Sequence, residues 1–76
     1  MKEIKLSLNN VENIKVFVQR VNKFPFDLDI KSRRYIIDAK SIMGLFSLNL
    51  AEPIYLICSS EHYDEVKEAV KEWIVD

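Results

Sequence analysis

The chain contains few of the residue types that small proteins use for cross-links, tight turns and catalysis. Its 76 residues include one cysteine, one glycine, one histidine and two prolines. A lone cysteine excludes an internal disulfide, and because Cys58 lies in an apolar run we interpret it as a buried free thiol. A single glycine, Gly44, excludes a glycine-rich phosphate-binding loop. A single histidine with no second histidine or cysteine beside it gives no support for a metal site, and we expect no cofactor.

Charge of one sign and long hydrophobic runs are also absent. The chain has 11 basic and 12 acidic side chains and a formal net charge of -1. Proteins that neutralise phosphates are usually basic, so we expect neither nucleic acid nor a membrane surface as a partner. The apolar runs are far shorter than the ~20 residues that span a bilayer, and the first residues lack the hydrophobic segment of a signal peptide. We therefore expect a cytoplasmic protein with a single domain, residues 1–76.

Hydrophobic periodicity predicts seven elements in the order β-α-β-β-α-β-α. Strands are predicted at residues 2–8, 26–31, 35–38 and 54–58, the last of them apolar on both faces and therefore central in the sheet. Helices are predicted after Asn9, over residues 40–48 and after Ser60. Asn9 and Glu12 have the spacing of a capping box, so Asn9 or Asn10 is expected to cap the first helix, and Ser60 is the predicted N-cap of the last helix.

The three predicted helices are amphipathic and need a common apolar surface. The strands supply it with Ile4, Leu6, Leu28 and Leu56, which predicts an α+β open-faced sandwich of a four-stranded sheet with helices on one face. Residues 32–34 connect two strands without the usual glycine or asparagine, so an irregular turn is expected.

The uncovered face of the sheet should carry some apolar side chains. Tyr55 and Ile57 are predicted to face that side, together with Ile36, and such a patch is compatible with a monomer or with weak self-association. Asp27 and Asp29 share the polar face of their strand, and we interpret them as solvated surface.

The most specific feature of the sequence is the segment AKSIMGLFSL, residues 39–48. It resembles the stretch around the second helix of HPr, the histidine-containing phosphocarrier of the sugar phosphotransferase system. In many Gram-positive members that stretch reads very nearly K-S-I-M-G-x-x-S-L. The likeness continues from about Phe17 into the last strand. The resemblance implies the HPr fold, with a four-stranded antiparallel sheet and three helices on one face.

The phosphorylation motif of the family, G-[IL]-H-x-R-P-A, lies between the first strand and the first helix, and its histidine accepts phosphate from enzyme I. Here residues 8–14 read LNNVENI, and the resemblance places Asn10 where the histidine would be. A carboxamide does not form the labile phospho-bond that imidazole forms. Near the place of the arginine, which would help to hold phosphate oxygens, stands Glu12, with the opposite charge. We therefore expect no catalytic residue, no family-type phosphocarrier activity and no enzyme.

The resemblance implies a regulatory site at Ser41. This serine aligns with the one that a dedicated kinase phosphorylates in many Gram-positive HPr proteins, whose modified form binds a transcriptional regulator in carbon catabolite repression. Lys40 adds positive charge beside it, and Ile42, Met43 and Phe46 would form an apolar docking patch for a protein partner. In the alternative interpretation, Ser41 only caps the helix and its apolar neighbours pack into the core.

Three functional hypotheses follow from these observations. The first is a regulatory or adaptor protein similar to the catabolite-repression HPr variants, with HPr kinase and a transcriptional regulator as partners. The second is a phosphocarrier that uses another residue; His62 is the only histidine, and it is predicted to be an exposed residue near the start of the last helix. The third is an HPr fold reused for an unrelated binding task.

Overall fold

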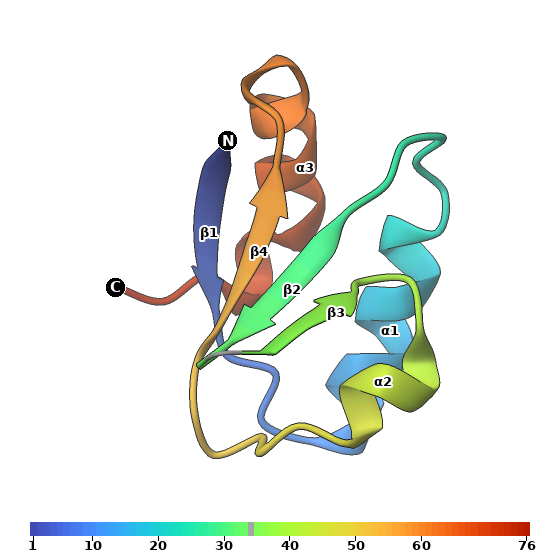
Figure 1. The fold of residues 1–76 in the computed structure, drawn as a ribbon, viewed down its shortest axis with the longest axis vertical. Coiled ribbons are helices and arrows are strands. Elements are labelled where there is room, and N and C mark those ends of the chain that lie inside the picture. Colours follow the sequence, from blue (N-terminus) through green and yellow to red (C-terminus); the bar gives the residue numbers. More distant parts are fainter. Residues whose placement is uncertain (34) are drawn as a thin grey trace.

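The computed structural model describes residues 1–33 and 35–76 of the chain. One antiparallel sheet has the order β1-β4-β2-β3 and consists of β1 (Lys2–Leu6), β2 (Asp29–Ser32), β3 (Tyr35–Asp38) and β4 (Ile54–Cys58). One face of it is covered by α1 (Val11–Val21), α2 (Ile42–Phe46) and α3 (Tyr63–Val70). The other face is open (Figure 1). The predicted α+β open-faced sandwich and its element order are confirmed.

Strand β4 is the interior strand that joins the two halves of the sheet. It is antiparallel both to β1 and to β2, with Leu56 opposite Ile4 on one side and opposite Ile30 on the other. Its alternate residues Ile54, Leu56 and Cys58 are buried beneath the helices. Tyr55 and Ile57 point to the open face, where each is half-buried. The predicted central strand at 54–58 is therefore confirmed.

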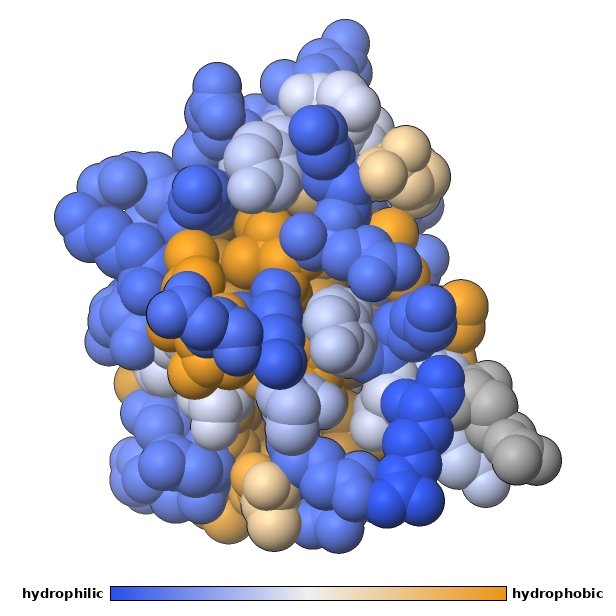
Figure 2. Space-filling view, turned by 90° about the vertical axis from the view of Figure 1, so that its left-hand side faces the viewer, coloured by the Kyte–Doolittle hydropathy of each residue, from blue (hydrophilic) through white to orange (hydrophobic). Residues whose placement is uncertain are grey.

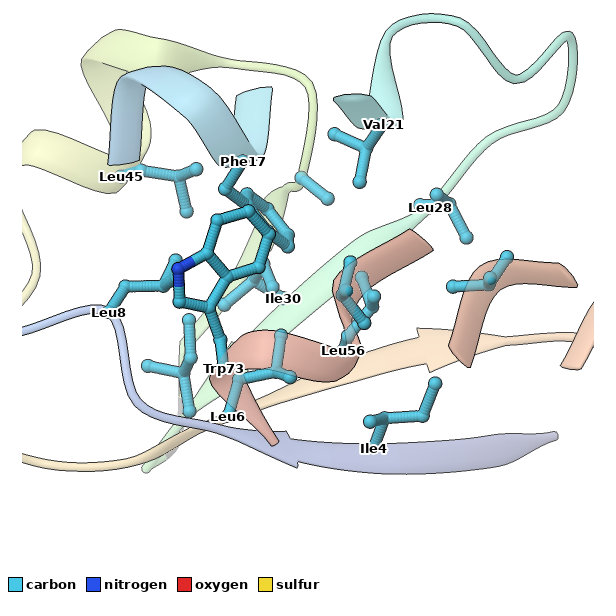
Figure 3. Packing of buried hydrophobic residues seen from close by; sticks show 14 of the residues in the cluster. Ile4, Leu6, Leu8, Phe17, Val21, Leu28, Ile30, Leu45, Leu56 and Trp73 are labelled. Carbon is cyan, nitrogen blue, oxygen red and sulfur yellow. The ribbon is translucent and has the colours of Figure 1, made fainter. Parts of the chain in front are cut away.

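The hydrophobic core lies between the sheet and the three helices (Figure 3). At its centre, Phe17 of α1 meets Trp73 edge to face, with ring centroids 5.8 Å apart and an interplanar angle of 72°. Such aromatic pairs contribute stability beyond the area that they bury. Cys58 is buried in the same core, and its burial raises the pKa of the thiol.

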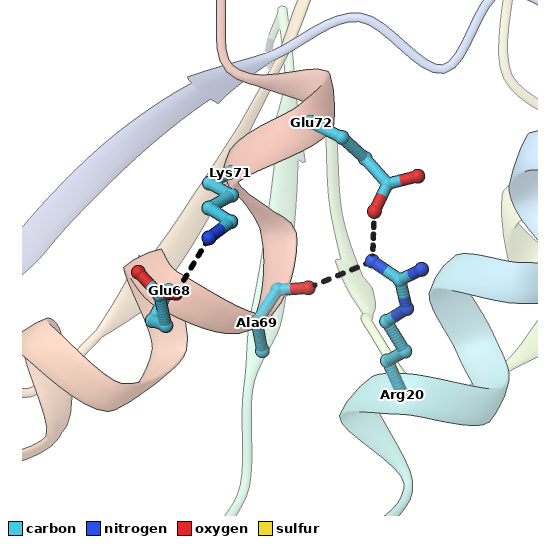
Figure 4. Close-up of polar contacts among 5 residues, drawn as sticks. All are labelled: Arg20, Glu68, Ala69, Lys71 and Glu72. Atoms are coloured by element: carbon cyan, nitrogen blue, oxygen red, sulfur yellow. Dashed lines mark hydrogen bonds and ion pairs between the residues drawn. The ribbon is translucent and has the colours of Figure 1, made fainter.

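A polar contact outside the core links α1 to the segment after α3. The Arg20 guanidinium donates to the Ala69 carbonyl at 3.1 Å and forms an ion pair with Glu72 (Figure 4). It also lies 4.7 Å from the centroid of the Trp73 ring, within cation–π range. These contacts fix the orientation of the two helices on the sheet.

The structure selects one of the two expected caps of α1 and differs from the prediction at the start of α3. Asn10 caps α1, because its side-chain oxygen accepts the Asn13 backbone N–H at 2.9 Å; the cap is therefore not Asn9. Before α3, a 3-10 turn covers Ser60–His62, and Ser60 is inside this turn instead of capping the helix. The residue before α3 is His62, and its side chain makes no capping hydrogen bond.

Strand β2 begins later than predicted, at Asp29 instead of residue 26. The preceding loop is held by aromatic stacking, with the rings of Phe24 and Phe26 5.1 Å apart. In the connection from β2 to β3, Arg33 has the left-handed φ of 55°, in accordance with an irregular turn. The predicted turn also includes Arg34, which lies outside the described residues.

Residues after α3 extend the sheet beyond the outer edge of β1. Ile74 forms an antiparallel bridge with Leu6, Ser7 donates its N–H to the Trp73 carbonyl, and Val75 donates to the Lys5 carbonyl. Two segments about seventy residues apart in the sequence, residues 5–7 and 73–75, therefore lie side by side. Over residues 1–33 and 35–76, no helix is long and apolar enough to cross a membrane.

Candidate functional site

The start of α1 is a cluster of three asparagines. Asn10 adopts an extended backbone and caps the helix through Asn13, while Asn13 donates its side-chain amide to the Asn9 side-chain oxygen at 3.0 Å. Glu12 lies in the first turn, where a carboxylate interacts favourably with the helix dipole. The start of α1 is therefore stabilised by hydrogen bonds of side-chain amides and by one negative charge.

The start of α2 uses the same device with a different side chain. Ser41 is the N-cap, and its Oγ accepts the Gly44 backbone N–H at 3.2 Å. A Cβ added at Gly44 would lie 2.6 Å from the Ile37 Cγ2 on β3, so the helix packs against the sheet more closely than any other residue allows. Ser41 is half-buried, with its hydroxyl at the edge of this contact.

The two charged side chains next to Ser41, Lys40 and Asp38, are hydrogen-bonded to backbone groups. The Lys40 ammonium donates to the Phe24 carbonyl at 2.7 Å, so it reaches toward the loop before β2. The Asp38 carboxylate accepts the Lys40 backbone N–H at 2.9 Å and places a negative charge one turn before Ser41. A phosphate on Ser41 would therefore gain the Lys40 charge only after this ammonium leaves Phe24.

The apolar residues of α2 divide between the core and the surface. Leu45 is buried, and Ile42 is partly buried against the core. Met43 is 76% exposed and Phe46 is 41% exposed, so these two side chains lie on the outside. The same short helix therefore packs against the core with one side and exposes the other.

His62 lies in a different environment from the one expected. Its side chain is only 27% exposed, and its ring stacks on Phe26 with centroids 3.7 Å apart. Nδ1 lies 2.9 Å from a carboxylate oxygen of Glu65, and Nε2 lies 3.1 Å from one of Glu61. The prediction of an exposed residue is wrong, because the loop before β2 folds back and covers the ring.

A shallow cavity of about 320 Å³ lies between the turn after β2 and the loop after α2. The residues around it are Ser32, Arg33, Tyr35, Ser47, Leu48, Asn49 and Glu52. Arg33 donates from Nε to a Glu52 carboxylate oxygen at 2.8 Å and from Nη2 to the other oxygen. This hydrogen bonding lowers the pKa of Glu52 and raises that of Arg33. No local pattern predicts this pair, since its members lie 19 positions apart.

Metal-binding groups do not come together in the part of the chain that the structure describes: there, three or more His, Cys, Asp or Glu side chains nowhere converge on one point. The Glu61–His62–Glu65 arrangement does not form such a group, because the carboxylates lie at opposite ring nitrogens.

Residues 11–76 match the family model described as "PTS HPr component phosphorylation site". The chain therefore belongs to the HPr family of the phosphotransferase system. Proteins of this family are phosphocarriers that interact with other phosphotransferase proteins and are not enzymes in the strict sense. Comparison with curated protein sequences finds no match.

Three solved structures are similar to this chain. HPr-C-His from Thermoanaerobacter tengcongensis has 25% identity and a TM-score of 0.77, over 95% of this chain and 89% of that one. The phosphocarrier protein HPr from Bacillus anthracis has 30% identity and a TM-score of 0.66, over 97% and 94%. Crh, the Bacillus subtilis catabolite repression containing protein, has 30% identity and a TM-score of 0.64, over 96% and 90%, and its crystal structure is described as a swapped, intertwined dimer.

Proposed function

We propose that this chain is a non-catalytic member of the HPr family, a regulatory or adaptor protein that acts by protein–protein contact and is switched by phosphorylation of Ser41. The contrast between two helix starts carries the proposal. Where the resemblance places the phosphorylated histidine, Asn10 offers a carboxamide that is already bonded to Asn13. At the start of α2, Ser41 offers a hydroxyl beside the exposed side chains of Met43 and Phe46.

The side chains of Asn10 and Ser41 differ in whether they can accept a phosphoryl group. A carboxamide nitrogen is a poor nucleophile and a poor leaving group, so it cannot relay a phosphoryl group. A serine hydroxyl accepts phosphate from a kinase and keeps it, which suits a switch. The added charge would change the surface next to Met43 and Phe46, where methionine adapts readily to a partner. The similarity to Crh, whose name refers to catabolite repression, favours the same role.

A phosphocarrier that uses His62 is the second candidate, and the surroundings of this ring disfavour it. Both ring nitrogens lie beside carboxylates, those of Glu61 and Glu65. A phosphoryl group on either nitrogen would meet like charge at hydrogen-bond distance, and the Phe26 ring covers one face of the imidazole.

The test is intact-mass spectrometry after incubation with an HPr kinase and ATP. We expect one added phosphate on the wild type and none on Ser41→Ala, while Ser47→Ala, at the other end of α2, remains a substrate. An unchanged wild-type mass, with a histidine-containing HPr labelled in parallel, would contradict the switch. Incubation with enzyme I and phosphoenolpyruvate is expected to leave the wild type unlabelled, and a labelled His62 would favour the second candidate.

A further inference from the structure

The open face of the sheet carries two rows of side chains with opposite charge. The strand register aligns one row across β1, β4, β2 and β3, consisting of Glu3, Ile57, Asp29 and Asp38. The next row consists of Lys5, Tyr55, Lys31 and Ile36. The first row contains three carboxylates, and the second contains two ammonium groups. The rows lie two residues apart along the strands, about 7 Å.

The centre of this face is apolar and incompletely covered. Tyr55 and Ile57 are half-buried on β4, and Ile36 on the edge strand is 64% exposed. Above β4, the Lys31 ammonium approaches the Glu3 carboxylate to 3.8 Å, with about half of each side chain exposed. Figure 2, which looks from the side of β1, shows hydrophobic surface between hydrophilic side chains.

We propose that this face binds a second copy of the same chain across a two-fold axis that runs along the rows, midway between them. Rotation about this axis places the basic row of one copy over the acidic row of the other, strand upon equivalent strand. Lys31 then faces Asp29 of the second copy, Lys5 faces its Glu3, and Tyr55 faces its Ile57. Because the axis is two-fold, each of these contacts occurs twice.

A two-fold axis parallel to the strands would also bring the open faces of two copies together. The charge pattern favours the axis that runs along the rows. A two-fold axis parallel to the strands would place Glu3 over Asp38 of the second copy and Lys31 over its Tyr55. That arrangement sets carboxylates against one another and pairs no opposite charges. Like charges at an interface are costly, so the row pattern specifies a single orientation. Ile36 meets Asp38 only at the edge, where the twist of two packed sheets separates them.

The small size of the face makes the dimer weak and sensitive to salt. Four strands about 4.8 Å apart and about five residues long present on the order of 300 Å² per copy, well below the ~800 Å² per partner of a stable interface. The intramolecular Glu3–Lys31 pair must exchange for intermolecular pairs. Exposed pairs of this kind contribute little, so the exchange costs little. This surface is separate from Ser41 and independent of the proposed switch.

Sedimentation equilibrium tests the dimer at protein concentrations on the order of 0.1–1 mM. We expect the dissociation constant to increase at least about tenfold when the salt concentration is raised from about 0.02 M to about 0.5 M, since the Debye length falls. Lys31→Asp should weaken the dimer by a similar factor, because two attractive contacts become repulsive. The exchange Lys31→Asp with Asp29→Lys should restore affinity to within about threefold of the wild type.

Lys71→Glu is the matched control, because its ion pair with Glu68 lies on α3, on the opposite side of the sheet. It changes the net charge in the same way and should leave the dissociation constant unchanged. Circular dichroism confirms that each variant is folded. In the wild type, the NMR amide shifts that depend on concentration should fall in β1, β4 and β2.

Three results would overturn the proposal. The first is a protein that stays monomeric at about 1 mM in low salt. The second is a dimer that Lys31→Asp leaves intact or that the double exchange does not restore. The third is a set of concentration-dependent shifts confined to α1 and α2, or a slowly exchanging dimer that salt does not affect.

Discussion

The starts of α1 and α2 are capped in the same way, but by side chains of different chemical reactivity. In each, a polar side chain accepts the backbone N–H three residues later, Asn10 from Asn13 and Ser41 from Gly44. The helix requires only an acceptor at this position, because the backbone donors of its first turn lack partners within the helix. Fold and phosphate chemistry are therefore separable here. Asn10 keeps the helix without offering a nucleophile.

The surroundings of the two caps reinforce the difference. The cap of α1 is followed by the exposed Val11, by Glu12 and by a further asparagine, so its neighbourhood is mostly polar and carries a negative charge. The cap of α2 is followed by exposed Met43 and by Gly44, which fits against Ile37. One end is closed by its own hydrogen bonds, and the other lies beside exposed apolar side chains, where we propose that a partner binds.

The largest expected effect is an all-or-none difference in phosphate acceptance between this chain and a histidine-containing HPr, and we expect a histidine alone not to remove it. Asn10→His introduces an imidazole at the start of α1, but Glu12 still faces the incoming phosphate. We expect no label from enzyme I and phosphoenolpyruvate, measured by intact mass beside a histidine-containing HPr. Asn10→His combined with Glu12→Arg tests whether charge is the remaining obstacle. Label on the single variant would show that a nucleophile alone suffices.

The second effect concerns the third residue of each helix. Gly44→Ala places a methyl 2.6 Å from Ile37 Cγ2, which is fixed on β3. Overpacking of this kind costs about 1–3 kcal/mol of the free energy of unfolding, more than the ~1 kcal/mol gained in helix propensity. Asn13→Ala, at the same place in α1, removes only the side-chain bond to Asn9 and should cost less. Urea denaturation measures both; equal losses would contradict the close packing of α2.

The caps themselves should contribute less. Asn10→Ala is expected to lower the free energy of unfolding by about 1 kcal/mol, and Ser41→Ala by a similar amount or less, because α2 has a single exposed turn after the cap. Asn9→Ala is the control, since Asn9 accepts a side-chain amide and no backbone N–H. A larger loss for Asn9→Ala than for Asn10→Ala would move the cap to Asn9.

The smallest effect is expected in the loop after α2. Hydrogen bonds from the Arg33 guanidinium lower the pKa of Glu52, and both residues lie away from α1. Arg33→Gln should raise this pKa toward its ordinary value, measured by NMR titration of the carboxyl carbon. Because the folded-state pKa is lowered, the pair stabilises the fold above the unfolded pKa and loses this contribution as the pH falls through the folded value. Chemical shifts in α1 should not change.

Much of the fold could be predicted from periodicity, because the core consists of regular elements with one buried face. The strands at 35–38 and 54–58 have the predicted bounds, and the α+β layers follow from the apolar stripes. The differences arise where tertiary contacts override local patterns. Phe26 alternates as a strand residue would, but stacks on His62, so β2 begins three residues later.

Less of the candidate site could be predicted from the sequence. The cap role of Ser41 followed from its residue type, but the direction of the Lys40 side chain depends on the Phe24 carbonyl, which comes from a loop 16 residues away. The exposure of Met43 and Phe46, with Leu45 buried between them, depends on where α2 rests on the sheet. Such contacts are set by packing, and no local pattern encodes them.

The pairing of residues 5–7 with residues 73–75 has a consequence for synthesis on the ribosome. The outer edge of β1 remains open until Val75 has left the exit tunnel, because the Ser7 N–H and the Lys5 carbonyl find their partners at Trp73 and Val75. Pairing residues 5–7 with residues 73–75 closes a long loop, which costs conformational entropy. Contacts that form earlier must already have reduced this cost. The nascent chain therefore carries an exposed strand edge until residues 73–75 have emerged, so the outer edge of β1 is covered only after the other strands of the sheet have been synthesised.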